Sequence, residues 1–290
     1  MLNKKRVKKA ESLLLARLLT RLLAGLLFIM TSINVLASPW EQIKVPVQGD
    51  PNPIGSYSNG CIIGAQALPL RGEGYQVIRA GKNRYYGHPE LLGYLQRLGK
   101  RAKQAGLPNV LIGDMGMPAG GRFISGHASH QTGLDVDIWL RFGPLSDKQA
   151  LNPTATLMVN RKAQRVDENV WTNQQTTLIR LAAQDAKVDR IFLNPAIKLK
   201  LCQTVQGDRT WLRKIRPWSG HDAHLHVRLS CPHGAGYCET QAPIPAGDGC
   251  GEELYSWFEP PKPGAKPSTP KAPPPIPQLC QMILSQQGRG

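Results

Sequence analysis

Five of the seven histidines of this 290-residue chain lie in two short segments, residues 125–137 and 221–226. Each segment overlaps a stretch in which polar and apolar residues alternate, 133–140 in the first case and 224–229 in the second. Such alternation predicts a β-strand, because successive side chains of a strand point to opposite faces of the sheet. If the fold makes the two strands neighbours in one sheet, their polar faces lie side by side. This arrangement strongly constrains how the chain can fold.

The polar faces of these two predicted strands carry groups that bind metal ions. Asp135 and Asp137 share the non-core face of the first strand, and His224 and His226 share one face of the second. His130 lies in the turn before the first strand. If the two strands are neighbours, His130, Asp137 and one histidine of the second strand can converge as two imidazoles and one carboxylate. That set is typical of a catalytic zinc site, which leaves a fourth position for water. A hydrogen-bonded histidine network is the alternative and would be favoured for one isolated histidine, but the clustering of five favours a metal.

The remaining histidines and Asp135 have several candidate roles. His127 is a candidate metal ligand, a hydrogen-bond donor to a ligand, or a polar turn residue. Asp135 is a candidate for orienting a histidine ligand, since such histidines usually donate their second ring N–H to a carboxylate or carbonyl. His88 and His233 stand apart from both clusters. We expect both to be ordinary surface histidines.

Hydropathy patterns elsewhere indicate an α+β fold. Apolar residues recur at helical spacing after Pro89 and between residues 173 and 186, and Pro195 suits the first turn of a further helix. Because these helices lie among strands expected to pair in hairpins, we expect a small central antiparallel sheet with peripheral helices. Residues 38–70 are rich in Pro, Gly, Ser and Asn, and they are expected to form an irregular arm held by a crosslink.

Residues 1–37 have the pattern of a cleavable signal peptide. A basic start is followed by an apolar run from Leu22 to Met30 and by small residues before Ser38. A membrane-spanning helix needs about 20 apolar residues, so the run predicts export and no stable membrane span after cleavage. The segment carries seven basic residues and one acidic residue. The rest of the chain therefore keeps a net charge of +10 out of the full chain's +16.

All six cysteines follow the predicted signal peptide. An even number of cysteines in an exported chain predicts three disulfides, although 15 pairings are possible. Nine prolines between residues 259 and 277 favour an extended segment, and Cys280 lies beyond them. We therefore expect a main domain at 38–258 and, at 259–290, a proline-rich strap and tail pinned back by Cys280.

Other function classes lack their motifs. His-Glu-x-x-His and Gly-x-Ser-x-Gly are absent, and the one Ser-x-x-Lys after the signal, at 268–271, lies among prolines that oppose a helix. A cysteine nucleophile is not expected if all six cysteines are paired. Aromatic residues make up only 6% of the chain and no nucleic-acid-binding motif occurs, so we expect no nucleic-acid partner.

Two motifs connect the chain to a known family. His130 and Asp137 form a His-x6-Asp motif, and residues 224–226 form a His-x-His motif. These are the signatures of the LAS metallopeptidases, which this chain resembles. Three longer stretches resemble the penicillin-insensitive murein endopeptidases within that family: residues 125–139, 190–198 and 211–218.

The resemblance implies a periplasmic zinc peptidase that hydrolyses D-alanyl-diaminopimelate crosslinks of peptidoglycan and is insensitive to β-lactams. It implies zinc ligands at His130, Asp137 and His226, with His127 as a further ligand in some states. Many relatives place a glutamate base shortly before the His-x-His pair, whereas this chain has His221 and Asp222 there. We therefore expect His221 or His224 to take a proton from the attacking water and return it to the leaving amine.

The resemblance also bears on substrate contacts and crosslinks. Arg122 and Arg228 are candidate contacts for substrate carboxylates, and a surface role is equally expected for either. The implied disulfides pair the six cysteines as follows: Cys61 with Cys280, Cys202 with Cys250, and Cys231 with Cys238. An alternative function is a non-catalytic, zinc-containing cell-wall binding module of the same fold.

Overall fold

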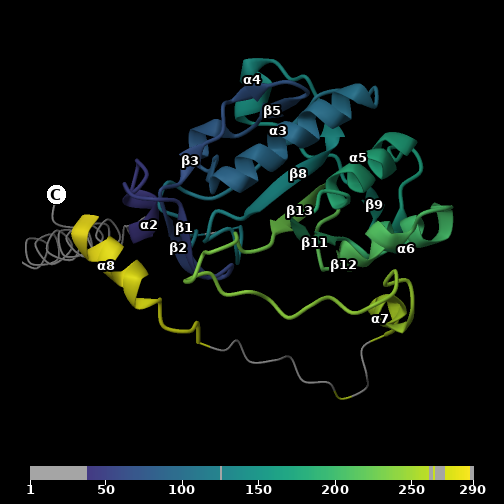
Figure 1. The fold of residues 1–290 in the computed structure, drawn as a ribbon. Coiled ribbons are helices and arrows are strands. Elements are labelled where there is room, and N and C mark those ends of the chain that lie inside the picture. Colours follow the sequence, from purple (N-terminus) through teal and green to yellow (C-terminus); the bar gives the residue numbers. More distant parts are fainter. Residues whose placement is uncertain (1–37, 125, 261–263, 265–271, 288–290) are drawn as a thin grey trace, which may run out of the picture. The chain divides into compact units, whose positions relative to one another are not determined.

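The computed structural model describes residues 38–124, 126–260, 264 and 272–287 (Figure 1). The predicted signal peptide at 1–37 and much of the predicted proline-rich strap lie outside these residues. Among the helices of the described residues, none is long and apolar enough to cross a membrane.

A mixed sheet of seven strands forms the centre of the described chain. Its strands are β4 (Arg71–Gly72), β5 (Tyr75–Val77), β7 (Val110–Ile112), β8 (Asp135–Phe142), β11 (Val188–Leu193), β12 (Ile215–Pro217) and β13 (His224–Leu229). They lie in the order β12, β11, β13, β8, β7, β5, β4. The pairs β5–β7 and β11–β12 are parallel and the other four are antiparallel. The predicted α+β class is confirmed, but the sheet is mixed rather than purely antiparallel.

Helical crossovers account for the parallel pairs. The helix α3 (Pro89–Gln104) lies between β5 and β7 in the chain, and α6 (Pro195–Thr204) lies between β11 and β12. Parallel neighbours cannot be joined by a tight turn and need a connection of about a dozen residues or more. The sequence indicated both helices, but the expectation that strands pair in hairpins left no place for the crossovers that they form.

Side-chain caps begin the main helices where the sequence places them. Asn194 accepts the N–H of Ala196 at the start of α6, and Thr172 forms a capping box with Gln175 at the start of α5 (Asn173–Ala183). At the start of α3, His88 Nδ1 accepts the N–H of Glu90 and the His88 side chain is buried. The expectation of a surface role for His88 is therefore wrong, because the ring serves as a helix cap. His233 is exposed, as expected.

The core lies between one face of the sheet and the helices α3 and α5, which contact each other (Figure 1). Leu95 of α3 and Leu178 of α5 are fully buried there, together with Val136 of β8 and Val227 of β13. The opposite face carries a smaller apolar cluster around Trp139 and Leu111. Asp135 and Asp137 point away from the main core and are nevertheless buried.

Shorter elements complete the described chain. They are α2 (Pro39–Gln42), β1 (Asn52–Ser56), β2 (Asn59–Ile63), β3 (Gln66–Ala67), η1 (Ala80–Lys82), β6 (Tyr86–Gly87), α4 (Asp147–Leu151), β9 (Val159–Asn160), β10 (Arg165–Val166), η2 (Thr210–Lys214), α7 (Glu252–Tyr255), η3 (Ser256–Phe258) and α8 (Gln278–Gln287). Three two-stranded sheets pair β1 with β2, β3 with β6, and β9 with β10. The expectation of an irregular arm at 38–70 is wrong, because the β1–β2 hairpin forms there and buries Ile54 and Cys61 in a second apolar cluster, whereas the expected crosslink is present at Cys61.

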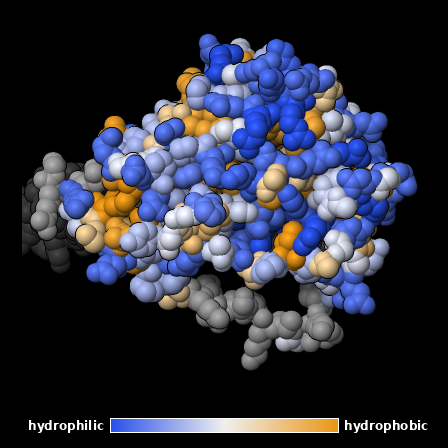
Figure 2. Space-filling model, viewed as in Figure 1, coloured by the Kyte–Doolittle hydropathy of each residue, from blue (hydrophilic) through white to orange (hydrophobic). Residues whose placement is uncertain are grey.

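Three disulfides crosslink the chain. They join Cys61 to Cys280, Cys202 to Cys250, and Cys231 to Cys238. The first bond attaches α8 to β2, and both of its cysteines are fully buried. Just before α8, Asn59 donates a hydrogen bond to the carbonyl of Pro275. The part of the tail that the structure describes is thus held against the β1–β2 hairpin. Figure 2 shows a largely hydrophilic surface in this view, with apolar groups in scattered patches.

Candidate active site

The two histidine-bearing segments meet in the centre of the sheet, where β8 and β13 are antiparallel neighbours. In this register Asp137 lies opposite His226, and Asp135 lies opposite Arg228. Because paired residues project from the same face of a sheet, the carboxylates of one strand face the basic side chains of the other.

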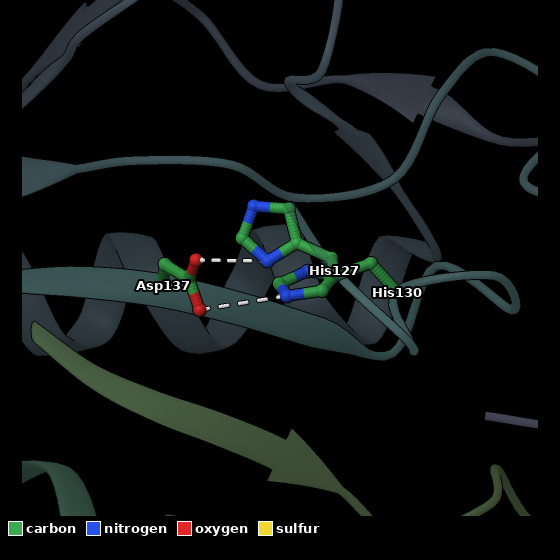
Figure 3. Close-up of side chains that lie close together, drawn as sticks. All are labelled: His127, His130 and Asp137. Atoms are coloured by element: carbon green, nitrogen blue, oxygen red, sulfur yellow. Dashed lines mark ion pairs between the residues drawn. The ribbon is translucent and has the colours of Figure 1, made fainter. Parts of the chain in front are cut away.

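Asp137 extends from β8 toward the imidazoles of His127 and His130 (Figure 3). His127 Nδ1 lies 3.4 Å from Asp137 Oδ2, and His130 Nε2 lies 3.4 Å from Asp137 Oδ1. The potential ligand atoms of the three residues all lie within 4.8 Å of one another. Two imidazoles and a carboxylate this close together can hold a metal ion.

The histidines of β13 approach the same carboxylate. His226 Nδ1 lies 3.3 Å from Asp137 Oδ1, and His224 Nε2 lies 3.6 Å from that oxygen. Asp137 is therefore surrounded by four imidazoles, from His127, His130, His224 and His226. His224 is the most exposed of the four side chains, with 27% of its surface accessible.

The turn that presents His130 is held by contacts to the β1–β2 hairpin. Gln131 donates from its side chain to the carbonyl of Ser58, and its backbone N–H donates to the carbonyl of Tyr57. His130 has a φ of 69°, a left-handed conformation that costs free energy in a non-glycine residue. Its N–H donates to Asp135 Oδ2 at 3.0 Å. These contacts hold His130 in the conformation that aims its ring at Asp137.

The electrostatics of the site favour positive charge. Burial alone would raise the pKa of Asp137, but His224 and His130 outweigh it and hold the pKa well below its usual range. Burial alone would lower the pKa of His226, but Asp135 and Asp137 outweigh it and raise the pKa to about 9. Two buried carboxylates thus carry negative charge that a cation must balance.

The unpartnered polar atoms of the site fit a bound metal ion. Both ring nitrogens of His130 and Asp137 Oδ1 are buried without a hydrogen-bond partner among the described residues. An unsatisfied buried polar atom costs about 1–3 kcal/mol, so a site that gathers three of them needs a further binding partner. Burial lowers the pKa of His130, which keeps its ring neutral and able to bind metal.

Asp135 and Arg228 lie behind His226. Asp135 Oδ1 is 3.4 Å from His226 Nε2, and both oxygens of Asp135 accept hydrogen bonds from the Arg228 guanidinium. Burial alone would raise the pKa of Asp135, but Arg228 and His226 outweigh it and keep the pKa well below its usual range. A charged Asp135 at this distance orients the His226 ring so that Nδ1 faces Asp137.

Asp114 plays the corresponding part behind His127. It follows β7, it is 2% exposed, and its Oδ2 lies 2.9 Å from His127 Nε2. Arg79 and Arg84 both form ion pairs with it. Burial alone would raise the pKa of Asp114, but the His127 hydrogen bond and Arg79 outweigh it and hold the pKa well below its usual range. His127 can therefore donate Nε2–H to Asp114 and present Nδ1 to the site.

His221 lies beside His224, with ring centroids 5.0 Å apart. It also has a left-handed backbone, with a φ of 50°. Its Nδ1 donates to the carbonyl of Ser219 at 2.9 Å, which leaves Nε2 as the ring's proton acceptor. Burial lowers the pKa of His221 to about 4, so the ring is neutral at neutral pH.

A cleft of about 760 Å³ opens onto this group, and its walls include His127, His221, His224 and His226. Arg228 also lines the cleft, but its guanidinium donates to Asp135 and Gln241 and is engaged within the protein. Arg122 is exposed and is not among the residues that line the cleft. The structure thus brings together the six predicted metal-site and proton-transfer residues, and Arg122 lies apart from them.

Residues 53–285 match the sequence profile of a family described as penicillin-insensitive murein endopeptidase. The chain belongs to this family. A penicillin-insensitive murein endopeptidase of Haemophilus influenzae is 65% identical over 265 residues, which cover 89% of this chain and 93% of that protein. Proteins of the same name from Klebsiella pneumoniae and Salmonella newport are 52% and 53% identical, covering 91% of this chain and 97% of theirs.

As a member of the murein endopeptidase family, the chain is a hydrolase of peptide bonds. The sequence carries no motif for one part of this site, namely Asp114 with its partners Arg79 and Arg84. The signal available was a carboxylate just after the apolar run of residues 110–112, which is typical of a buried strand. The two arginines had no recognisable pattern, because only the folded chain brings them to Asp114.

Proposed function

We propose that this murein endopeptidase is zinc-dependent and hydrolyses D-alanyl-diaminopimelate crosslinks of peptidoglycan. The observation that carries the proposal is the buried Asp137 carboxylate surrounded by four imidazoles, where Asp137 Oδ1 and both ring nitrogens of His130 lack a hydrogen-bond partner among the described residues. Histidine and carboxylate ligands with one position open to a cleft are typical of catalytic zinc sites.

His130, Asp137 and His226 would hold the ion, with His127 as a further ligand. Bound there, zinc supplies a Lewis acid that polarises a carbonyl and makes water more acidic. Asp135 and Asp114 hold the rings of His226 and His127 in place. This arrangement gives each of the two histidines a carboxylate partner behind the site.

Proton transfer falls to the two histidines at the mouth of the site. His221 offers an unprotonated Nε2 to the cleft, and His224 lines the cleft next to Asp137. Either ring can take a proton from the attacking water and return it to the leaving amine. The mechanism uses no serine nucleophile, so a β-lactam has no serine hydroxyl to acylate.

The compartment and partners follow from the same proposal. A signal peptide at 1–37 would deliver the enzyme to the periplasm, where its substrate is the peptide-crosslinked wall. Free carboxylates of the wall suit the net positive charge of the exported chain. Three disulfides are compatible with an oxidising compartment.

Digestion of purified sacculi tests the function. The purified protein should convert crosslinked muropeptides to uncrosslinked ones, lose this activity with a chelator and regain it with zinc. Metal analysis should find zinc in the wild-type protein. A protein that binds sacculi and zinc without releasing products would instead be a non-catalytic wall-binding module.

Alanine variants assign the roles. His130→Ala and His226→Ala should lose zinc and activity together, whereas His221→Ala or His224→Ala should lose turnover by about a hundredfold or more and keep zinc. His233→Ala, an exposed histidine outside the site, is the matched control. Near-normal turnover in both His221→Ala and His224→Ala would show that neither histidine transfers the proton.

A further inference from the structure

A second cavity, in addition to the large cleft, adjoins the candidate metal site. It has a volume of about 280 Å³, and its walls include Arg79, Lys82 and Arg84. His127 and His224 line both this cavity and the cleft. The candidate metal site therefore lies where the two hollows meet, which is the arrangement needed by a substrate with an arm on each side of its scissile bond.

The cationic side chains of this cavity are not equally engaged. Arg79 and Arg84 form ion pairs with Asp114, and Arg84 also pairs with Glu41. Lys82 is exposed and forms no ion pair with any residue that the structure describes. Asp114 and Asp137 also line the cavity and balance the charge of the two arginines, so the Lys82 ammonium is the cation there that is available to an anion.

Hydrogen bonds hold the backbone on either side of Lys82. Lys82 ends the short helix η1, which is flanked by Arg79 with a φ of 58° and Asn83 with a φ of 56°. Two non-glycine residues in left-handed conformation are strained, and such strain persists only where the surroundings hold it. Here the Arg79 N–H donates to the carbonyl of Ala150, and the Asn83 side chain donates to the carbonyl of Lys44.

The local potential is also favourable to an anion. Partial burial lowers the pKa of Lys82, and the charges of Arg79 and Arg84 lower it further, whereas the charge of Asp114 raises it. The positive charge that the two arginines place near Lys82 also attracts a carboxylate. Ala155 and Ala223 line the cavity with small side chains and leave space for a ligand group.

We propose that this cavity binds the free carboxylate next to the scissile amide nitrogen, with Lys82 as its direct cationic contact. The inference rests on the proposed function. In a D-alanyl-diaminopimelate crosslink, the carbon attached to that nitrogen also carries a free carboxylate, whereas the D-alanyl side offers a methyl group. The small cavity with Lys82, beside the candidate metal site, therefore binds the diaminopimelate part of the crosslink. The larger cleft binds the part on the acyl side of the scissile bond.

Two non-hydrolysable crosslink analogues test this subsite. They differ only in having a carboxylate or a carboxamide at the carbon next to the amide nitrogen, and their affinities are measured by calorimetry. The wild-type protein should bind the carboxylate about tenfold more tightly, as expected for one charge-assisted contact. In Lys82→Ala this ratio should fall toward one, and in Lys82→Arg it should largely persist. Lys100→Ala, at an exposed lysine of α3, should leave the ratio unchanged.

Equal binding of both analogues by the wild type, or an unchanged ratio in Lys82→Ala, would overturn the proposal. Hydrolysis of the corresponding cleavable pair separates this outcome from failure of the proposed function. If neither cleavable peptide is hydrolysed by the zinc-loaded protein, the proposed function fails, while the binding ratio still decides the subsite.

Discussion

At the scale of single residues, the candidate site combines side chains that could hold a metal ion with carboxylates that orient them. His226 lies between Asp137 and Asp135, and His127 lies between Asp137 and Asp114. Each of these rings therefore has one nitrogen near the shared carboxylate and the other near a carboxylate behind it. This geometry fixes the ring orientation before any ligand binds, so that little reorganisation is needed on metal binding.

Asp114→Asn tests this orienting role. The change keeps the size of the side chain but removes the charge that accepts the His127 hydrogen bond and pairs with Arg79. Zinc affinity, measured by competition with a chromogenic chelator, should fall about tenfold or more. Asp147→Asn, which removes an acid paired with Arg71 on the surface, is the control. Wild-type zinc affinity in Asp114→Asn would contradict the assignment.

At the scale of elements, the site depends on the packing that fixes β8 and β13. Their apolar faces pack under α3 and α5, so the helices determine the plane of the strands and hence where the polar faces meet. A shift of one residue in the register of β13 would turn His224 and His226 toward the core. The buried apolar residues of β13 and β8 oppose such a shift because it would bring Leu225 and Val227 out of the core.

Leu95→Ala in α3 measures this packing. Leu95 is fully buried, so truncation should lower the free energy of unfolding by about 2–5 kcal/mol through lost burial and a residual cavity. The neighbouring Gln96→Ala is exposed and should change it by about 0.5 kcal/mol or less. Denaturant unfolding with the disulfides intact measures both. Equal effects of the two substitutions would show that α3 does not pack as described.

Lys198 on α6 predicts a pH dependence of stability. Its Nζ donates to the carbonyls of Leu212 and Asp248, and burial lowers its pKa from 10.5 to about 7. Because the folded-state pKa is the lower one, the folded protein binds this proton less well than the unfolded chain. The resulting decrease in the free energy of unfolding has its full size below about pH 7 and should disappear as the pH rises to about 10.5.

Comparison with Lys198→Met isolates this effect, because the other titrating groups are shared. The free energy of unfolding of the wild type should rise relative to that of Lys198→Met between pH 7 and pH 10. Chemical denaturation at several pH values measures the difference. A constant difference across this range would mean that Lys198 titrates alike in the folded and unfolded chains.

At the scale of the whole molecule, disulfides connect segments that are distant in sequence. The bond between Cys61 and Cys280 spans 219 residues and buries both sulfurs in the cluster shared by β2 and α8. The bond between Cys231 and Cys238 spans only seven. A crosslink that closes a longer loop removes more conformational entropy from the unfolded chain.

Paired alanine substitutions test this difference. Replacing Cys61 and Cys280 should lower the free energy of unfolding by about 5 kcal/mol, and replacing Cys231 and Cys238 by about 2 kcal/mol, on the loop-entropy relation. Denaturant unfolding measures both variants against the wild type. A larger loss from the short bond than from the long one would show that loop entropy does not dominate.

The chain's own pattern was sufficient for most of the central strands and helices and for the types of residue in the site. Alternation marked β8 and β13, helical spacing marked α3 and α5, and prolines marked where α3 and α6 begin, because these signals depend on neighbours within a few residues. The same patterns identified His130, Asp137 and the β13 histidines as candidate ligands. Local signals could not show the order of the strands, so the parallel crossovers were missed. The β1–β2 hairpin was missed because residues 38–70 are rich in Pro, Gly, Ser and Asn.

The tertiary structure alone decided which distant residues meet. It placed Asp114 and its arginines behind His127, turned Arg228 toward Asp135, and formed the cavity lined by Lys82 beside the candidate metal site. Each of these contacts joins segments whose separation along the chain is bridged by packing and pairing rather than by a local pattern. Such contacts depend on the burial of the whole chain, because only the complete core fixes which strands and turns become neighbours.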